Sequence, residues 1–260
     1  METERARAVA FVERMQDAMV ERRVAFAHGT ALFHGDLPHA WSLNLVRVED
    51  DAAELSAAQL LAEVDRLLGG AGLVHRKLEL NSEAAGGRLE PTLRECGWKV
   101  ERALVMAHEG APVPGPAEDR AEEVARGVLE PKWERGMRTA PWATDEIVAQ
   151  LLEAMRLRER AVAVRYFAVR DAGVPVAECS LFSDGTVAQV ESVHTEAAFR
   201  GRGFARAVVS RAVGEARRAG HELVVLLADE EDWPHELYRR LGFRPVGRVW
   251  DAVRSPASRR

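Results

Sequence analysis

The hexapeptide Arg200-Gly201-Arg202-Gly203-Phe204-Ala205 constrains the fold more than any other segment of this 260-residue chain. It lies between a strand-like run, Thr186–Thr195, and an amphipathic helix predicted over Phe204–Ala219. Gly201 and Gly203 allow a sharp turn and a close approach of another group to the backbone. A helix N-terminus presents unpaired N–H groups and partial positive charge, so this turn predicts a cradle for a phosphate or pyrophosphate.

The elements after the turn strengthen this interpretation. A strand predicted over His221–Ala228 is almost continuously apolar, as expected of a fully buried strand. A short helix opened by Pro234 then ends in the sequence Leu237-Tyr238-Arg239-Arg240-Leu241-Gly242-Phe243. The order of these elements and the pattern Arg-x-x-Gly-x-Ala resemble the GCN5-related N-acetyltransferase (GNAT) family. The resemblance covers residues 120–253 and implies an α/β (α+β) acyl-CoA N-acyltransferase fold, with a mixed central sheet flanked by helices.

Composition places the chain among globular proteins and excludes several function classes. Hydrophobic residues make up 47% and charged residues 30%, and the net charge of −5 argues against general nucleic-acid binding. Cys96 and Cys179 have neither metal-site nor redox-motif spacing. The apolar runs are too short for a membrane span, and the acidic N-terminal residues do not resemble a signal peptide. We therefore expect a cytoplasmic protein without nucleic-acid or membrane partners.

A segment rich in proline and glycine, Gly110–Pro116, divides the chain into two halves. It predicts a domain over residues 1–109, a linker over 110–119 and a catalytic domain over 120–260. The second half reads as a complete GNAT-like plan. Its predicted strands are Glu122–Val128, Val162–Arg170, Val174–Phe182 and Thr186–Thr195, with helices at Lys132–Arg138 and Asp145–Arg158.

The first half resembles a degenerate copy of the same plan, so that the fold is expected twice. When Gly97-Trp98 is aligned with Gly242-Phe243, Leu93 occupies the position of Tyr238 in the second half. The alternative is a single catalytic domain with a long unrelated N-terminal extension. The predicted elements are a helix over Glu4–Glu21, strands at Val24–Phe33, Trp41–Val48 and Leu73–Leu80, a helix from Ser56 to Gly69-Gly70, and a helix from Ser82.

The anion-binding chemistry is missing from the first half. The segment 49–54 that corresponds to the phosphate turn has no glycine and contains Glu49, Asp50, Asp51 and Glu54. Carboxylates at a helix N-terminus would repel a pyrophosphate. This half is therefore expected to bind no CoA, and to buttress the second half, shape the acceptor pocket or form a homodimer contact.

The resemblance implies acetyl-CoA as the acetyl donor and requires no metal. Its pyrophosphate would be held by Arg200, Gly201, Arg202, Gly203, Phe204 and Ala205. The backbone of Val193 and Thr195, at the end of the preceding strand, would pair with the pantetheine arm.

Two side chains are predicted to carry the reaction. Strict alternation places Gln189, Glu191, Val193 and Thr195 on one face of their strand, and His194 on the other. Glu191 is the candidate general base, with Asp184 or a water molecule as alternatives. The family match makes Tyr238 the general acid at the CoA sulfur. One position departs from the family pattern: Glu231 stands where many relatives have an asparagine that contacts the cofactor.

The predicted function is acetyl transfer from acetyl-CoA to a primary amine of a small molecule or protein. The first alternative is an acyl-CoA-binding or sensing protein without turnover. The second reads Arg200–Gly203 as an RNA-binding arginine–glycine stretch, but such stretches lie in low-complexity tails and this one is flanked by buried-pattern elements. The sequence does not identify the amine acceptor.

Overall fold

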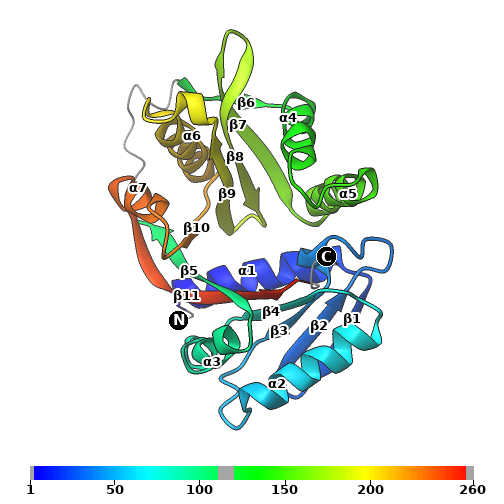
Figure 1. Cartoon of the computed structure of the whole chain (residues 1–260). Helices are drawn as coiled ribbons and strands as arrows, with labels where there is room; N and C mark the ends of the chain where they lie inside the picture. The colour runs from blue at the N-terminus through cyan, green and yellow to red at the C-terminus, as the bar shows by residue number, and fades with distance from the viewer. Residues whose placement is uncertain (1–2, 111–119, 256–260) are drawn as a thin grey trace.

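The computed structural model describes residues 3–110 and 120–255. Within these ranges, eleven strands form a single sheet in the order β1-β2-β3-β4-β11-β5-β10-β9-β8-β7-β6. Neighbouring strands are antiparallel except in the pairs β3–β4 and β9–β10, which are parallel. Figure 1 shows the first half at one end of this sheet, the second half at the other, and β5 and β11 crossing between them. Residues 111–119 of the predicted linker lie outside the described residues.

The first half contains the predicted elements with shifted boundaries. The predicted strand over Val24–Phe33 is a hairpin, and Trp41–Leu43 forms a 3-10 turn before β3. Its helices begin at side-chain caps, which satisfy the free N–H groups of the first turn. The elements are α1 (Glu4–Met19), β1 (Arg22–Phe26), β2 (Gly29–Phe33), β3 (Leu45–Val48), α2 (Ala57–Val64) with a π-helical turn (Asp65–Gly69), β4 (Arg76–Leu80), α3 (Glu83–Glu95) and β5 (Lys99–His108).

The second half follows the predicted plan closely after its first helix. That helix begins at Arg126, so the predicted strand over Glu122–Val128 is too long and the predicted helix start at Lys132 is wrong. Pro131 lies inside the helix, and the complete burial of Leu129 offsets the backbone hydrogen bond lost there. The elements are β6 (Glu122–Val124), α4 (Arg126–Arg138), α5 (Asp145–Ala161), β7 (Ala163–Asp171), β8 (Val174–Ser183), β9 (Val187–Thr195), α6 (Phe204–Arg218), β10 (Leu223–Asp229), α7 (Pro234–Arg240) and β11 (Phe243–Arg254).

The two halves exchange their last strands. β5 follows α3 of the first half, yet it pairs with β10 of the second half. β11 follows α7 of the second half, yet it pairs with β4 of the first half. β5 and β11 also pair with each other from Phe243–His108 to Val253–Lys99. Each half therefore completes the sheet of the other.

Helices cover both faces of the sheet. On one face, α6 and α7 pack on the second half, and α2 and α3 on the first. On the other face, α1 lies beside α5 over the centre of the sheet, where the apolar side chains of both helices join one core (Figure 1). The ion pairs Arg7–Glu222 and Arg14–Asp184, at 2.9 and 2.7 Å, connect α1 to the second half. A helix of the first half thus forms part of the surroundings of the second.

We predict that Gly86→Ala lowers stability although alanine favours helices. A Cβ on Gly86 in α3 would lie 2.2 Å from the buried Trp250 ring of β11. Such overpacking costs about 1–3 kcal/mol. At Gly87, the next residue of α3, a Cβ meets no atom within 4 Å. The control Gly87→Ala should therefore be neutral or stabilising by about 0.5–1 kcal/mol.

Urea unfolding followed by circular dichroism measures both changes. If the two variants shift the midpoint equally, α3 does not pack on the exchanged strand as the structure places it.

Candidate functional site

The N-terminus of α6 lacks the side-chain cap that begins α1, α2, α3 and α5. Its N-cap, Gly203, has a φ of 78°, and Gly201 has a φ of 75°, which are left-handed values that glycine adopts without strain. A Cβ at either glycine would meet no atom within 4 Å, so the space in front of the helix is open. The first N–H groups of α6 are therefore available to an anion.

Four arginines surround this opening. Arg200 donates from Nε to the carbonyl of Thr195 at 3.2 Å, and the Arg202 guanidinium lies 5.0 Å from the Phe199 ring centroid. Arg120 donates to the carbonyl of Arg202 at 3.2 Å and lies 4.5 Å from the Phe204 ring centroid. Among the described residues, these three and Arg206 form no ion pair with a carboxylate. They leave positive charge uncompensated where the helix presents its N–H groups.

Arg120 was not anticipated from the sequence. It precedes β6 and is separated by about eighty positions from the loop it contacts, and nothing in the local sequence marks it. The predicted residues of this loop, by contrast, come together as expected in one continuous turn at the start of α6, with Phe204 buried beneath it.

β9 and β10 separate beside this opening. Their parallel pairing runs only from Val187–Leu223 to Val190–Leu226, although β9 continues to Thr195 and β10 to Asp229. The backbone of Glu191–Thr195 therefore has no strand partner on the β10 side. The Ser192 N–H donates to Glu191 Oε1 and the Thr195 carbonyl accepts from Arg200. The other backbone groups on that side can pair with an extended ligand, as in β-augmentation at a sheet edge. Val193 and Thr195 lie in this unpaired stretch, where the sequence predicted a pantetheine contact.

A bulge at Ser192 corrects the predicted faces of β9. Ser192 has a φ of 54°, and the register with β8 shifts between Glu178 and Ser180. The alternation of side chains therefore reverses after Glu191. Val193 packs into the core under α6, whereas Glu191 faces the α1 side. The prediction that these two residues share a face is wrong because one extra residue is inserted between them.

The same bulge corrects the position predicted for His194. His194 is the register partner of Glu178, whose carboxylate accepts hydrogen bonds from Lys132 and Trp133 of α4. Register partners point to the same face of a sheet. His194 therefore lies on the face that carries Glu191, about half exposed and 3.8 Å from Glu196.

Glu191 lies at the edge of a cavity of about 500 Å³ enclosed by α1, α5 and the sheet. We call it the central cavity. Gln189 Nε2 donates to the Glu191 carboxylate at 2.7 Å, and the buried Gln189 Oε1 has no partner. The polar lining of the central cavity consists of Gln16, Ser42, Glu79, Asn81, Glu101, Arg158, Gln189, Glu191, Ser192 and Asp251. The apolar lining comes from α1, β5, β10 and β11, with Leu43 and Phe182.

Tyr238 lies on α7, on the opposite side of the sheet from α1, and is almost fully buried. Its ring meets Phe243 at a centroid distance of 6.2 Å. Burial raises the pKa of the Tyr238 hydroxyl to about 12, and the nearby charge of Glu191 acts in the same direction. The Glu191 carboxylate and the protonated Tyr238 hydroxyl thus approach the gap between β9 and β10 from the two faces of the sheet.

Asp184, the alternative base, is engaged elsewhere. One of its oxygens accepts hydrogen bonds from the backbone N–H groups of Thr186 and Val187, and the other accepts from Arg14. Burial alone would raise its pKa, but these donors hold the pKa of Asp184 at about 2. A carboxylate so stabilised in its charged form is a poor proton acceptor. The geometry favours Glu191.

The corresponding region of the first half is closed. β3 and β4 stay paired to their ends, and the Asn81 N–H donates to the Val48 carbonyl at 3.0 Å. Arg88 donates to the carbonyls of Leu55 and Ala52, which ties the acidic segment to α3. These contacts leave no gap between strands for an extended ligand. That this half binds no CoA stays a prediction.

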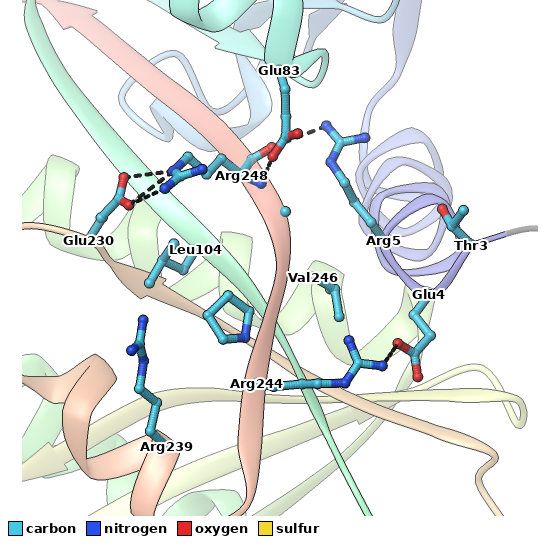
Figure 2. A pocket seen from close by; sticks show the side chains of 12 residues that line it. Thr3, Glu4, Arg5, Glu83, Leu104, Glu230, Arg239, Arg244, Val246 and Arg248 are labelled. Carbon is cyan, nitrogen blue, oxygen red and sulfur yellow. Dashed lines mark hydrogen bonds and ion pairs between the residues drawn. The ribbon is translucent and has the colours of Figure 1, made fainter.

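A second cavity, of about 580 Å³, is lined by the start of α1, by β11 and by Arg239 of α7 (Figure 2). It is rich in arginine, but Arg248 is bound by Glu230, and Arg244 by Glu4 and Glu109. These two charges are compensated within the protein. Arg5 and Arg239 also line the cavity, and Arg5 donates to the carbonyls of Asn81 and Arg248.

A family comparison concerns part of the second half of the chain. Residues 131–243 match the model of the acetyltransferase (GNAT) family. This segment is therefore similar to a GNAT domain. The match spans the α6 turn, Glu191 and Tyr238. No curated protein matches the chain by sequence.

Solved structures resemble the whole chain. A GCN5-related N-acetyltransferase from Kribbella flavida is 20% identical with a TM-score of 0.61, covering 95% of each chain. A functionally unknown conserved protein from Staphylococcus epidermidis is 12% identical with a TM-score of 0.67, covering 90% of this chain and 93% of that one. A tandem GNAT protein from the clavulanic acid biosynthesis pathway is 13% identical with a TM-score of 0.52, covering 83% and 76%. These likenesses concern the fold, and they confirm the predicted fold class and tandem arrangement.

Two further observations concern the part of the chain that the structure describes. It contains no helix long and apolar enough to cross a membrane. It also contains no group of three or more His, Cys, Asp or Glu side chains placed to hold a metal ion.

We predict that Gly203→Asp weakens acetyl-CoA binding about tenfold or more. The new carboxylate would stand against the phosphates at the α6 N-terminus, and hydrogen bonds to charged groups contribute about 1.5–3 kcal/mol. Gly203→Asn is the control, because asparagine has the same shape, tolerates a positive φ and carries no charge. Calorimetry should also give one acetyl-CoA per chain. Equal affinity in the two variants would contradict the phosphate assignment.

Proposed function

We propose that the chain is an acetyl-CoA-dependent N-acetyltransferase that acts on a primary amine of a small molecule or protein. One observation carries the proposal. The unpaired backbone of Glu191–Thr195 leads from the open N-terminus of α6 to the edge of the central cavity. A donor held by its phosphates at α6 would reach through this gap, and an amine in the central cavity would meet it.

The residues of the gap fit the donor. Arg120, Arg200, Arg202 and Arg206 with the α6 N–H groups would hold the pyrophosphate, and the backbone at Val193 and Thr195 would hold the pantetheine arm. The bound donor supplies an acetyl thioester. Transfer forms a C–N bond to the amine and breaks the C–S bond, so one proton leaves the amine nitrogen and one reaches the sulfur.

Glu191 and Tyr238 would move these protons. Glu191 accepts the proton of the amine directly or through a water molecule, while Gln189 orients its carboxylate. Tyr238 donates its hydroxyl proton to the departing sulfur. Its raised pKa keeps it protonated throughout the neutral range, as a general acid requires.

A non-catalytic acyl-CoA-binding or sensing protein is the alternative. It would bind acetyl-CoA at the same gap without releasing the thiol to any amine. The carboxylate and phenol that approach the gap from opposite faces favour turnover, because binding alone requires neither.

We predict that Glu191→Gln lowers turnover about 100-fold or more. The amide keeps the shape of the side chain and removes its ability to accept a proton, and acid–base catalysis contributes about 10²–10⁴-fold. Acetyl-CoA affinity should change little. Glu196→Gln, on the exposed loop after β9, is the control. Wild-type turnover in Glu191→Gln at neutral pH would assign the base to water.

We predict that Tyr238→Phe lowers turnover about 100-fold or somewhat less, with acetyl-CoA affinity nearly unchanged. The variant keeps the ring packing against Phe243 and deletes only the hydroxyl. Because the pKa of Tyr238 is about 12, well above its usual value, the wild-type rate should not fall between pH 8 and 10 through loss of this proton. Steady-state rates against pH measure this. A large loss of affinity with turnover preserved would show Tyr238 to be a cofactor contact.

A further inference from the structure

Three carboxylates lie side by side at the end of the central cavity remote from α5. Asp251 of β11 is the register partner of Glu79 in β4 and of Glu101 in β5. We call these three residues the acid row. Directly opposed like charges destabilise a sheet. The row is partly compensated by Lys77, which binds Asp251 and lies 3.8 Å from Glu79, and by Lys99, 2.5 Å from Glu101.

The acid row faces the cavity. All three of its members line the central cavity, whereas neither Lys77 nor Lys99 does. The cavity lining thus presents carboxylates, and the compensating ammonium groups stand outside it. This end is suited to a cationic group of a ligand.

The opposite end of the cavity carries a cation. Arg158 of α5 lies with its guanidinium 5.0 Å from the Phe182 ring centroid, and its buried Nε has no hydrogen-bond partner. Among the described residues, Arg158 forms no ion pair. Its guanidinium is therefore available to an anionic group, for which two parallel N–H bonds give a strong and directional contact.

Between these ends lies an orphaned acceptor beside the candidate base. Gln189 is 3% exposed and lines the cavity, with Nε2 bound to Glu191 and Oε1 unpartnered. If the Gln189 amide were flipped, its Oε1 would face the Glu191 carboxylate and two acceptors would meet. The contact with Glu191 therefore fixes Oε1 as the atom without a partner. A buried acceptor without a partner costs free energy that a ligand N–H would recover.

The floor between Glu191 and the acid row is apolar. Leu227 and Val105 are register partners on β10 and β5, at the level of Glu191, and Ala103 and Val249 follow toward the row. Glu101 lies four residues before Val105, two strands away from β9. With strands roughly 4.8 Å apart and roughly 3.3 Å per residue, the Glu191 and Glu101 backbones are roughly 16 Å apart. Because the Glu191 and Glu101 side chains both extend into the cavity, a short aliphatic stem of a ligand spans the remaining distance between their carboxylates.

We propose that the acceptor is a basic α-amino acid, acetylated on its α-amine. Across the cavity, the Arg158 guanidinium comes first, then Glu191 with the unpartnered Gln189 Oε1, then the apolar floor, and finally the acid row. The complementary order in a ligand is carboxylate, amine, aliphatic stem, cation. This places the carboxylate on Arg158, the α-amine at Glu191 and Gln189, and the side-chain ammonium or guanidinium at the acid row. The assignment rests on the proposed acetyl transfer.

The reaction follows from this placement. The α-nitrogen forms a C–N bond to the acetyl carbon, and the C–S bond of acetyl-CoA breaks. The α-nitrogen loses its proton to Glu191, and the sulfur receives one from Tyr238. The products are an Nα-acetyl basic amino acid and CoA.

Three matched amines test the proposal with the full chain and saturating acetyl-CoA. L-Lysine carries all the groups, 1,5-diaminopentane lacks the carboxylate, and L-2-aminohexanoate lacks the distal ammonium. We expect kcat/KM for CoA release to be about tenfold or more higher with L-lysine than with either analogue, since each lost contact is a hydrogen bond to a charged group. Mass spectrometry of the product should place the acetyl group on the α-nitrogen.

Two variants separate the ends of the cavity. Arg158→Gln should raise KM about tenfold for L-lysine and L-2-aminohexanoate and leave 1,5-diaminopentane unaffected. Glu101→Gln should raise KM for L-lysine and leave L-2-aminohexanoate unaffected. Arg160→Gln, on the exposed side of α5, and Glu63→Gln, on α2, are the matched controls. Thermal unfolding checks that each variant is folded.

Equal kcat/KM for the three amines, or acetylation of the side-chain amine, would overturn the proposal. Its failure is distinguishable from that of the proposed function. If a polyamine or peptide amine releases CoA while L-lysine does not, the acceptor assignment is wrong and acetyl transfer stands. If acetyl-CoA does not bind, the proposed function is wrong. Calorimetric binding of L-lysine to the wild type but not to Arg158→Gln would still support the chemistry assigned to the cavity.

Discussion

The antiparallel pairing of β5 with β11 is the contact on which the rest of the structure depends. It joins strands that end the two halves of the chain and builds them into a single sheet. Because β4 and β10 flank this pair, neither half has a free sheet edge at the centre, where unpaired N–H and C=O groups would otherwise need another partner. The pairing also positions α1 across the junction, so that a helix of the first half walls a cavity that opens at the candidate base of the second.

The duplicated plan has diverged in one physical respect, which is whether the parallel strands separate. In the second half, β9 and β10 part after Val190, and a bulge at Ser192 turns Val193 into the core. In the first half, β3 and β4 remain paired to their ends and Arg88 ties down the acidic loop. A gap between strands exposes backbone groups and costs stability unless a ligand satisfies them. Only the second half, in which the N-terminus of α6 is uncapped and rich in arginine, has such a gap. This difference is consistent with a ligand-binding second half and a first half that supports it.

Much of the candidate site was predictable because it is local. The turn Arg200–Ala205, the helix after it and the end of α7 at Gly242 are determined by glycine positions and a 3.6-residue period. Tyr238 was singled out by the resemblance to the GNAT family, because it stands at the matching offset from Gly242. The face of Val193 and His194 was mispredicted because strict alternation assumes no bulge, and a serine at positive φ gives no clear signal in sequence. The start of α4 was mispredicted because burial of Leu129 outweighs the helix-breaking tendency of Pro131.

The sequence by itself determined the fold class, the two halves, the glycine turn at Arg200–Ala205 and the absence of such a turn from the first half. Each of these follows from residues that are neighbours along the chain. Only the tertiary structure decided which strands are adjacent at the centre of the sheet. Those strands in turn determine which side chains surround the candidate site. Glu79, Glu101 and Asp251 are separated by up to 172 positions, yet they form one row because β11 lies between β4 and β5. Arg120 likewise reaches the turn before α6 through packing alone. Strand order and register arise from long-range pairing, and no local pattern encodes them.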